Sequence, residues 1–426
     1  MTRLAIIGTG YVGLTTGVCF AHLGHDVVCA DVDVDKVARL NRGEVSIVEH
    51  RLDELLAEGL RKGNLRFVVG AAAAVTDAEI VFLCVPTPQG EDGSADLSYV
   101  EAASAQIAKA LAYEAIVVNK STVPVGSTRV VERVLQRPDV RVVSNPEFLR
   151  EGSAVDDFLK PDRVVVGCED NAAAVAVAAL YDAIRPHVII TDPASAETIK
   201  YAANAFLATK LSFVNAIAAI CEGVGADVDD VMVGIGYDKR IGSEFLRPGP
   251  GWGGSCFGKD SRALLNIATN AGYRFDLLSG VIAVNDEQFD RVTDKIRVGA
   301  GGSLKGATIA VWGLTFKART DDLRDSPSIS IINRLLAQGA RVQAFDPTVA
   351  AIKPGVPADV VIHENVVSAT ADADVLAVLT EWDDFRWTAP ADVAAVMKGR
   401  HVVDGRNLLD RAAWQHAGFT HVGIGR

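Results

Sequence analysis

The sequence lacks several features that mark other classes of protein. Positive charge is scarce, since 54 aspartates and glutamates outnumber 42 lysines and arginines and give a net charge of −12. A nucleic-acid-binding surface needs clustered lysine and arginine, so this balance argues against such a partner. We find no unbroken run of about 18 apolar residues and no charged-then-apolar leader at the start. The sequence therefore predicts neither a membrane span nor a signal peptide.

Cysteine is also scarce, with six in 426 residues. The cysteines stand at positions 19, 29, 84, 168, 221 and 256, without the paired spacing of a zinc site or a disulfide framework. This scatter is typical of free thiols in the reducing cytoplasm, and it predicts no metal site. The remaining composition, 49% hydrophobic and 23% charged, is that of a soluble globular protein. The length predicts two or three domains.

Glycine is plentiful, and its first cluster follows an apolar run at residues 4–7. The run leads into Gly8, Thr9, Gly10, Tyr11, Val12 and Gly13, and a helical pattern follows at 14–23. A strand, a G-x-G-x-x-G turn and a helix in this order are typical of a dinucleotide site. The glycines allow a tight turn and a close approach of the backbone to a pyrophosphate. A purely structural turn is the alternative, and the coincidence of all three elements argues against it.

An acidic residue follows this motif at the expected spacing. The strand-like residues 27–30 end at Asp31, about 20 residues after the glycines, where a carboxylate binds ribose hydroxyls and repels a 2′-phosphate. The sequence therefore predicts NAD rather than NADP. We expect further strands at 80–85, 116–119 and 142–144, and ligands of a doubly wound sheet bind beyond such strand ends. The polar loops after these strands contain Pro86, Thr87, Thr122 and Glu147.

Two polar residues interrupt a long apolar segment in the middle of the chain. Residues 196–221 predict one long helix, which Asp192 as N-cap and Pro193 as first helical residue would start. Lys200 and Asn204 stand four residues apart, on one face of this helix. They need polar partners there, although a lysine that extends to solvent is the alternative. Glu147, unless it lies on an exposed helical face, is a candidate for acid–base chemistry.

The segment 247–260 is unusually rich in glycine and contains Cys256, with Lys259 and Asp260 just beyond it. Glycine at this density suits a loop whose backbone approaches a ligand, not a helix or strand interior. Nearby cationic groups favour the thiolate, which is the form that attacks a carbonyl carbon. A glycine-rich surface turn with an incidental cysteine is the alternative. Helical patterns follow at 259–272 and 277–296.

The plan of the first domain reappears after residue 302. We expect strands at 308–313, 341–346, 374–380 and 401–404, and a helix at 328–336, but the G-x-G-x-x-G is missing. Cationic side chains stand in its place, which suits a ligand with a diphosphate better than a second dinucleotide. Solvated loops are the alternative for each of them. These cations are Lys317, Arg319, Arg324 and Arg406.

The fold prediction is therefore α/β, with two Rossmann-like doubly wound domains joined by a long central helix. We place the NAD-binding domain at 1–195, a central helical domain for dimerisation and the active site at 196–298, and a C-terminal Rossmann-like domain for the second ligand at 299–426.

Seven motifs, in order over nearly the whole chain, resemble those of the UDP-glucose/GDP-mannose dehydrogenase family of nucleotide-sugar dehydrogenases. The segment from Lys200 to Asn204 and the triplet Arg240-Ile241-Gly242 resemble the UDP-glucose branch. The seven motifs occupy residues 8–13, 121–128, 145–152, 200–204, 251–260, 313–324 and 404–406.

The resemblance implies a cytoplasmic enzyme that oxidises C6 of UDP-glucose to a carboxylate with two NAD⁺ and one water, for polysaccharide biosynthesis. It implies that Cys256 attacks the intermediate aldehyde and forms a thioester. Lys200 and Asn204 stabilise the oxyanion, and Asp260 with a water, helped by Lys200, removes the hydroxyl proton. Glu147 is the base for thioester hydrolysis. Thr122 and Glu151 help to position the hydrolytic water.

The resemblance also implies binding residues and a partner. A homo-oligomer, at least a dimer that pairs through the central helix, is expected, with Arg240 reaching the partner's site. The expected cofactor residues are Gly8, Gly10, Tyr11, Val12, Gly13, Asp31, Lys36, Pro86, Thr87, Thr122, Glu151 and Arg324. The expected substrate residues are Glu147, Phe148, Leu149, Glu151, Lys200, Asn204, Arg240, Phe245, Arg247, Gly253, Lys317 and Arg406.

Two alternatives remain from the sequence. One is a sister enzyme that acts on GDP-mannose or a UDP-N-acetylhexosamine by the same chemistry. The other is a non-catalytic NAD-binding sensor, which would need none of Cys256, Lys200, Asn204 and Asp260.

Overall fold

The computed structural model describes residues 1–90 and 94–426, which form two compact units. The first unit contains residues 1–203 and 262–272, and the second contains residues 204–261 and 273–426. The division between them falls inside the long helix α9 (Pro193–Val224). The three-domain boundaries at 195/196 and 298/299 stay a prediction.

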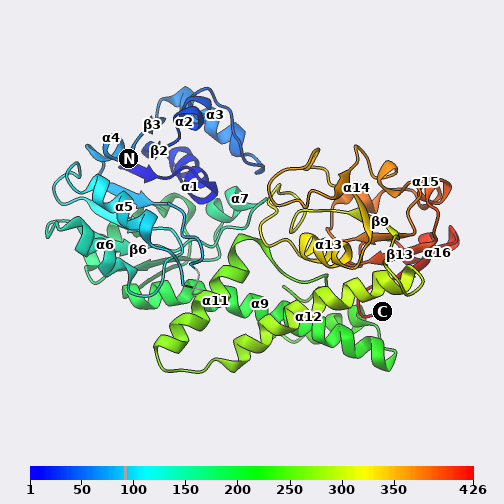
Figure 1. The fold of residues 1–426 in the computed structure, drawn as a ribbon. Helices are drawn as coiled ribbons and strands as arrows, with labels where there is room; N and C mark the ends of the chain where they lie inside the picture. The colour runs from blue at the N-terminus through cyan, green and yellow to red at the C-terminus, as the bar shows by residue number, and fades with distance from the viewer. Residues whose placement is uncertain (91–93) are drawn as a thin grey trace. The chain divides into compact units, whose positions relative to one another are not determined.

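The first unit, whose chain is coloured from blue to green in Figure 1, is built on a sheet. The strand order of this sheet is β3-β2-β1-β4-β5-β6-β7-β8. All neighbouring strands in it are parallel except β6 and β7, which pair antiparallel. The order 3-2-1-4-5-6 of its first six strands is that of a doubly wound nucleotide-binding fold. The strands are β1 (Arg3–Ile7), β2 (Asp26–Asp31), β3 (Leu65–Val69), β4 (Ile80–Leu83), β5 (Ile116–Asn119), β6 (Arg141–Ser144), β7 (Val164–Gly167) and β8 (Val188–Thr191).

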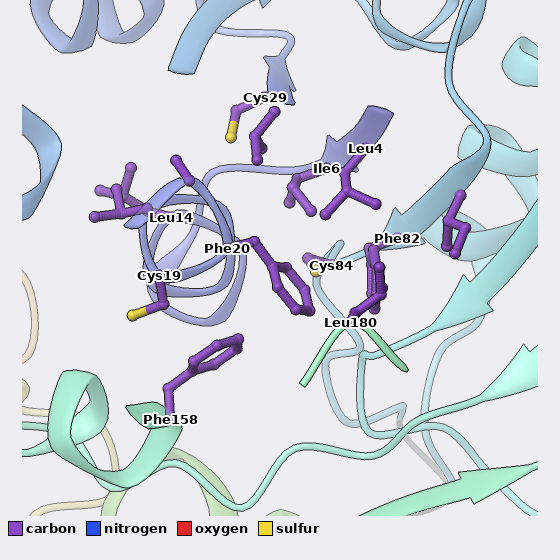
Figure 2. Packing of buried hydrophobic residues seen from close by; sticks show 14 of the residues in the cluster. Leu4, Ile6, Leu14, Cys19, Phe20, Cys29, Phe82, Cys84, Phe158 and Leu180 are labelled. Carbon is purple, nitrogen blue, oxygen red and sulfur yellow. The ribbon is translucent and has the colours of Figure 1, made fainter. Parts of the chain in front are cut away.

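Helices cover both faces of this sheet, and each face has its own apolar core. On one face the Phe20 ring of α1 packs 5.2 Å from Phe82 of β4 and 5.0 Å from Phe158 of α7, measured between ring centroids (Figure 2). The helices are α1 (Tyr11–His22), α2 (Val34–Asn41), α3 (Leu52–Lys62), α4 (Ala71–Val75), α5 (Ser98–Ile107), α6 (Ser127–Leu135), α7 (Ala154–Leu159), α8 (Asn171–Ala179) and the 3₁₀ turn η1 (Asp182–Ile184).

The second unit contains a parallel sheet with the order β11-β10-β9-β12-β13-β14, which repeats the 3-2-1-4-5-6 order of the first. Its strands are β9 (Thr308–Trp312), β10 (Arg341–Phe345), β11 (Val360–Ile362), β12 (Val375–Val378), β13 (His401–Asp404) and β14 (Thr420–Val422). Its remaining elements are α10 (Val228–Gly236), α12 (Asp276–Gly299), α13 (Pro327–Ala337), η2 (Ser368–Thr370), α14 (Asp383–Arg386), α15 (Pro390–Val396) and α16 (Arg411–His416).

The repeat extends to the turn after the first strand of each sheet. Gly8 and Gly313 have φ angles of 95° and 94°, and each N–H donates across the turn to the second strand, at 2.8 Å. The predicted α/β fold with two doubly wound sheets and a long helix is thus confirmed. The expected strands lie where the sequence placed them, with ends shifted by up to two residues.

Helix α9 begins at Pro193, as predicted, and the side chain of Asp192 accepts the Ser195 N–H at 2.8 Å. By length and composition α9 is a candidate membrane span, the one such helix among the described residues. This is weak evidence, because the core helix of a soluble protein passes the same test.

One local prediction is wrong. The loop that carries Cys256 ends earlier than expected, because helix α11 runs from Gly254 to Asn270 instead of starting at Lys259. Cys256 therefore lies in the first turn of a helix.

Candidate functional site

The turn between β1 and α1 has the geometry of a dinucleotide site. A Cβ on Gly13 would lie 1.9 Å from the carbonyl oxygen of Gly8, so glycine is required there for packing alone. A Cβ on Gly10 would meet no atom of the described residues within 4 Å. Packing does not require glycine at this position, whereas the close approach of a pyrophosphate does. The residues after β1 therefore fit the dinucleotide that the sequence predicts, with the N-terminus of α1 behind them.

Asp31 ends β2, as expected, and its carboxylate is already organised. Oδ2 accepts the N–H of Thr9 at 3.0 Å, the Thr9 hydroxyl, and the ammonium of Lys36 at 3.1 Å. Partial burial alone raises the pKa of Asp31, but these hydrogen bonds, with one from the Asp33 N–H, lower it to about 2. The carboxylate therefore stays negative, as the predicted recognition of ribose hydroxyls needs. Lys36, also expected at the cofactor, is its ion-pair partner.

A residue that the sequence did not single out, Glu49, joins two predicted cofactor segments. Tyr11, in the first turn of α1, donates its hydroxyl to Glu49. The N–H of Gly152, next to Glu151, donates to Glu49 Oε2 at 2.8 Å and to the Tyr11 oxygen at 2.7 Å. Glu49 precedes a short helix, and its neighbours form no motif, so its role becomes visible only in the fold.

A buried ion pair in the first unit joins Glu147 to Lys200. The Lys200 ammonium lies 2.9 Å from Glu147 Oε1, and both side chains are buried. Burial raises the pKa of Glu147, but the charge and hydrogen bond of Lys200, with the Leu149 N–H at 2.6 Å, outweigh it and lower the pKa. Phe148 is close as well, since its ring lies 5.5 Å from Lys200 Nζ and 3.6 Å from the Arg163 guanidinium carbon. The structure thus brings together the expected residues Glu147, Phe148, Leu149 and Lys200.

The loops after β4 and β5 meet through the Thr87 hydroxyl, which donates to the carbonyl oxygen of Thr122 at 2.8 Å. Pro86 lies beside Thr87 in the same loop. The buried carboxylate of Glu197, one turn before Lys200 on α9, accepts the N–H groups of Gly126 and Thr128. This contact ties the start of α6 to α9. The loop that carries Thr122 is therefore fixed at both ends.

The second unit holds the candidate nucleophile and a buried acid. Asp260 is fully buried; Oδ2 accepts the Asn204 amide at 2.6 Å and Oδ1 accepts the Lys259 ammonium at 2.8 Å. Cys256 lies four residues before Asp260 on α11 and is half-buried, with the Ser255 hydroxyl 3.6 Å from its sulfur. The partial positive charge of a helix N-terminus stabilises an anion on such a sulfur. Lys259, which the sequence offered as a nearby cation, is the partner of Asp260.

The glycine-rich loop before Cys256 passes close to the carboxyl end of the second sheet. A Cβ on Gly253 would lie 1.8 Å from the Asp325 carbonyl oxygen, and one on Gly249 would lie 3.2 Å from the Arg406 guanidinium. Arg406 donates to the carbonyl oxygens of Leu379 and Phe316 at 3.0 and 3.1 Å. Gly249 of this loop thus lies beside the predicted substrate residue Arg406, whereas Gly253 lies beside Asp325. Lys317 is next to Phe316 and 5.3 Å from its ring.

The remaining expected cations are at the surface. Arg240 pairs with Asp238 and Arg324 pairs with Asp322, while Arg247 is exposed. Phe245 adopts a left-handed φ of 60° and packs against Phe257 with the ring centroids 6.4 Å apart. The binding roles of these four residues stay predictions. In the described part of the chain, no group of three or more His, Cys, Asp or Glu side chains is placed to hold a metal ion.

Comparisons with known proteins cover the whole chain. Three family models match: the NAD binding domain of the UDP-glucose/GDP-mannose dehydrogenase family at residues 2–185, its central domain at 194–287 and its UDP binding domain at 310–411. A UDP-glucose 6-dehydrogenase of Pseudomonas aeruginosa is 45% identical, over 100% of this chain and 97% of its own.

Two solved structures are similar over nearly their full length. A UDP-glucose dehydrogenase of Pyrobaculum islandicum has a TM-score of 0.90 at 36% identity, with 97% of this chain and 98% of its own covered. A UDP-D-ManNAc dehydrogenase of Pyrococcus horikoshii has a TM-score of 0.89 at 27% identity, and the match covers 100% of this chain and 99% of its own.

Proposed function

This chain belongs to the UDP-glucose/GDP-mannose dehydrogenase family, and we propose that it oxidises UDP-glucose to UDP-glucuronate with NAD⁺. The observation that carries the proposal is the Lys200–Glu147 pair together with the Asn204–Asp260 pair, since Lys200 and Asn204 stand four residues apart on α9. Two buried acids, each held by a residue of the same helix, are what a reaction with both proton removal and hydrolysis needs. NAD⁺, when bound, accepts the hydride in each of the two oxidations.

In the first oxidation the C6 hydroxyl loses its proton while C6 loses a hydride, which gives the aldehyde. We assign the proton transfer to Asp260, acting through a water, with help from Lys200. The Asn204 amide and the Lys259 ammonium hold the Asp260 carboxyl group in one orientation. A fixed acceptor of this kind contributes through its position as much as through its basicity.

In the second oxidation Cys256 Sγ bonds to C6 of the aldehyde and forms a thiohemiacetal, whose oxyanion Lys200 and Asn204 stabilise. Loss of the second hydride from C6 leaves a thioester. Water then adds to the carbonyl carbon as Glu147 accepts one of its protons, and the carbon–sulfur bond breaks to release the Cys256 thiolate and a carboxylic acid. The acid loses the second proton to solvent and becomes the carboxylate. The lowered pKa of Glu147 means that it is ionised, and so able to accept a proton, at neutral pH. Thr122 and Glu151 help to position this water.

We propose that the NAD⁺ site is formed by the turn from Gly8 to Gly13, by Asp31, and by the loops after β4 and β5, with Arg324 as a further contact. UDP-glucose is held by the loop that contains Gly253 and by cationic side chains, which suit a diphosphate. These cations are Arg240, Arg247, Lys317 and Arg406. We retain the predicted division into an NAD-binding domain at 1–195, a central helical domain at 196–298 and a C-terminal domain for the nucleotide sugar at 299–426.

We also propose that the protein is a cytoplasmic homodimer, whose product supplies glucuronate for polysaccharide biosynthesis. Support for a dimer comes from α9, where Phe206, Phe213 and Ile220 recur every seven residues and are 66, 52 and 57% exposed. Large apolar side chains at this spacing form one stripe on a helix. A second copy of this chain is the partner that the resemblance implies for this face.

NADH formation with a panel of nucleotide sugars tests the proposed substrate. We expect UDP-glucose to give the highest kcat/KM, and GDP-mannose and the UDP-N-acetylhexosamines to give little NADH. High activity with one of those sugars instead would identify a sister enzyme, which the fold cannot separate because a UDP-D-ManNAc dehydrogenase shares it. No NADH with any sugar, together with intact NAD⁺ binding, would support a sensor.

A further inference from the structure

A second lysine of the first unit is buried close to Glu147, and the proposed mechanism does not use it. Lys120 directly follows β5 and is 4% exposed. Its ammonium lies 3.1 Å from Asn145 Oδ1 and 3.5 Å from the carbonyl oxygen of the same residue. A buried ammonium is costly unless its contacts compensate for the lost hydration. The burial of the Lys120 ammonium therefore suggests that its charge has a function.

The partner of Lys120 is the residue from which the Glu147 segment starts. Asn145 is 1% exposed, and its Oδ1 accepts from both Lys120 and the Tyr181 hydroxyl, the latter at 2.8 Å. Its amide nitrogen donates to the Val165 carbonyl oxygen at 2.7 Å, and its N–H donates to Asn119 at 2.9 Å. Asn145 is thus fixed from the strands on both sides. Pro146, with its restricted φ, is the only residue between Asn145 and Glu147.

We propose that Lys120 is a positioning residue for Glu147: it fixes the segment through Asn145 and supplies a second buried cation that keeps Glu147 ionised for thioester hydrolysis. This role rests on the proposed function. It is separate from that of Lys200, which contacts the carboxylate directly. If Lys200 turns to the substrate oxyanion, Lys120 still provides a positive charge beside Glu147.

The electrostatics of the cluster agree with this geometry. The positive charge of Lys120 is among the influences that lower the pKa of Glu147, after those of Lys200 and the Leu149 N–H. Burial and, to a lesser extent, the positive charge of Lys200 lower the pKa of Lys120 to about 8, against the opposing effects of Cys84 and Glu147. With Tyr181, these are the titratable groups that face Lys120 from β4, β6, α8 and α9 and the loops after them. At neutral pH Lys120 is mainly charged.

Three variants separate the charge of Lys120 from its hydrogen bond. Lys120→Met removes both, and Lys120→Gln keeps a donor for Asn145 without the charge. Tyr181→Phe removes the other donor to Asn145, and with it the hydroxyl oxygen that lies 3.4 Å from the Lys120 ammonium, without changing any charge. Lys120→Met should fold, because Tyr181 still donates to Asn145 and an apolar group replaces a buried charge. If it does not fold, Lys120→Gln gives the same test. A melting curve and NADH affinity check each variant.

The measurement is the rate at which the covalent adduct on Cys256 disappears after mixing with UDP-glucose and NAD⁺, followed by rapid quench and intact-protein mass spectrometry across pH. Removing a cation near a carboxylate raises the pKa of that carboxylate. The hydrolysis rate falls at low pH, where Glu147 becomes protonated. We therefore expect this fall to move to higher pH by roughly one unit in both Lys120 variants. At a pH below the fall, each variant should then hydrolyse the adduct about tenfold more slowly than the parent protein. Tyr181→Phe should show the fall at the same pH as the parent protein.

A fall at the same pH as in the parent protein, in Lys120→Met and Lys120→Gln, would overturn the proposal. So would an equal, pH-independent loss in all three variants, because that is the result of structural support alone. These outcomes differ from a failure of the proposed function, in which the parent protein itself would form no adduct from UDP-glucose.

Discussion

The ammonium of Lys200 lies 2.9 Å from Glu147 Oε1, and the two side chains are 4% and 5% exposed. A carboxylate and an ammonium so far from water stabilise a protein only as a pair, because each alone would be a buried, uncompensated charge. The pair connects α9 to the loop after β6. It therefore couples the integrity of the first unit to the ionisation of the group that we assign to thioester hydrolysis.

Lys200→Met should cost about 3–5 kcal/mol in the free energy of unfolding at neutral pH, as expected when one member of a buried pair is removed. The pKa of Glu147 is lowered by folding. Its stabilising contribution is thus present above its unfolded pKa of about 4.3 and is lost as the pH falls below that value. The cost of Lys200→Met should shrink over the same pH range. Urea unfolding of parent and variant at several pH values measures this, and a pH-independent difference would contradict it.

Asp31→Asn should relax the choice of cofactor. The variant keeps an oxygen for the Thr9 hydrogen bonds but loses the charge that repels a 2′-phosphate, and it frees Lys36 from its ion pair. We expect the ratio of kcat/KM for NAD⁺ to that for NADP⁺ to fall on the order of tenfold. Asp346→Asn is the matched control, since Asp346 accepts the N–H groups of Leu314 and Thr315 in the second sheet. If both variants keep the parental ratio, Asp31 does not contact the ribose.

Cys256→Ser and Glu147→Gln should stop the reaction at different covalent states. Serine attacks the aldehyde weakly, and an ester is hydrolysed more slowly than a thioester, so Cys256→Ser should turn over very slowly and accumulate an adduct on the introduced serine hydroxyl. Glu147→Gln removes the base and should leave the thioester on Cys256. Peptide mass spectrometry after mixing with UDP-glucose and NAD⁺ locates each adduct. If Cys256→Ser turns over at the same rate as the parent protein, Cys256 is not the nucleophile.

Phe213→Glu should separate the proposed dimer. It places a charge in the exposed apolar stripe of α9, and a charge desolvated at an interface without a partner opposes association. Val361→Glu is the control, because Val361 is also exposed, at 57%, but lies on β11. Sedimentation equilibrium should give the mass of one chain for Phe213→Glu and of two chains for the control. A dimer that persists in Phe213→Glu would place the interface elsewhere.

The sequence predicts the arrangement of strands and helices well, because periodic apolar runs and glycine turns are local signals. Five of the eight strands in the first sheet, four of the six in the second, the start of α9 at Pro193 and the position of Asp31 at the end of β2 were predictable in this way. The other strands, which are β3, β7, β8, β11 and β14, were not predicted. The start of α11 was not, since glycines at its N-terminus suggest a loop.

The supporting residues of the site carry no such signal. Glu49 stands in a segment without a motif and Lys120 stands just outside the motif at 121–128, and their partners are 103 and 25 residues away. Only the fold brings a carboxylate to Gly152 or an ammonium to Asn145. A lone Lys120 after a strand reads from sequence as an ordinary surface residue.

The account's central claim, a double oxidation at one carbon, is tested most directly by counting NADH. UDP-glucose at limiting concentration is incubated with excess NAD⁺, and NADH absorbance is compared with the UDP-glucose consumed and UDP-glucuronate formed. The mechanism predicts two NADH for each UDP-glucose, with UDP-glucuronate as the product and little free aldehyde. One NADH for each sugar, with the aldehyde accumulating, would contradict the assignment of Cys256 and Glu147 to a second oxidation through a thioester.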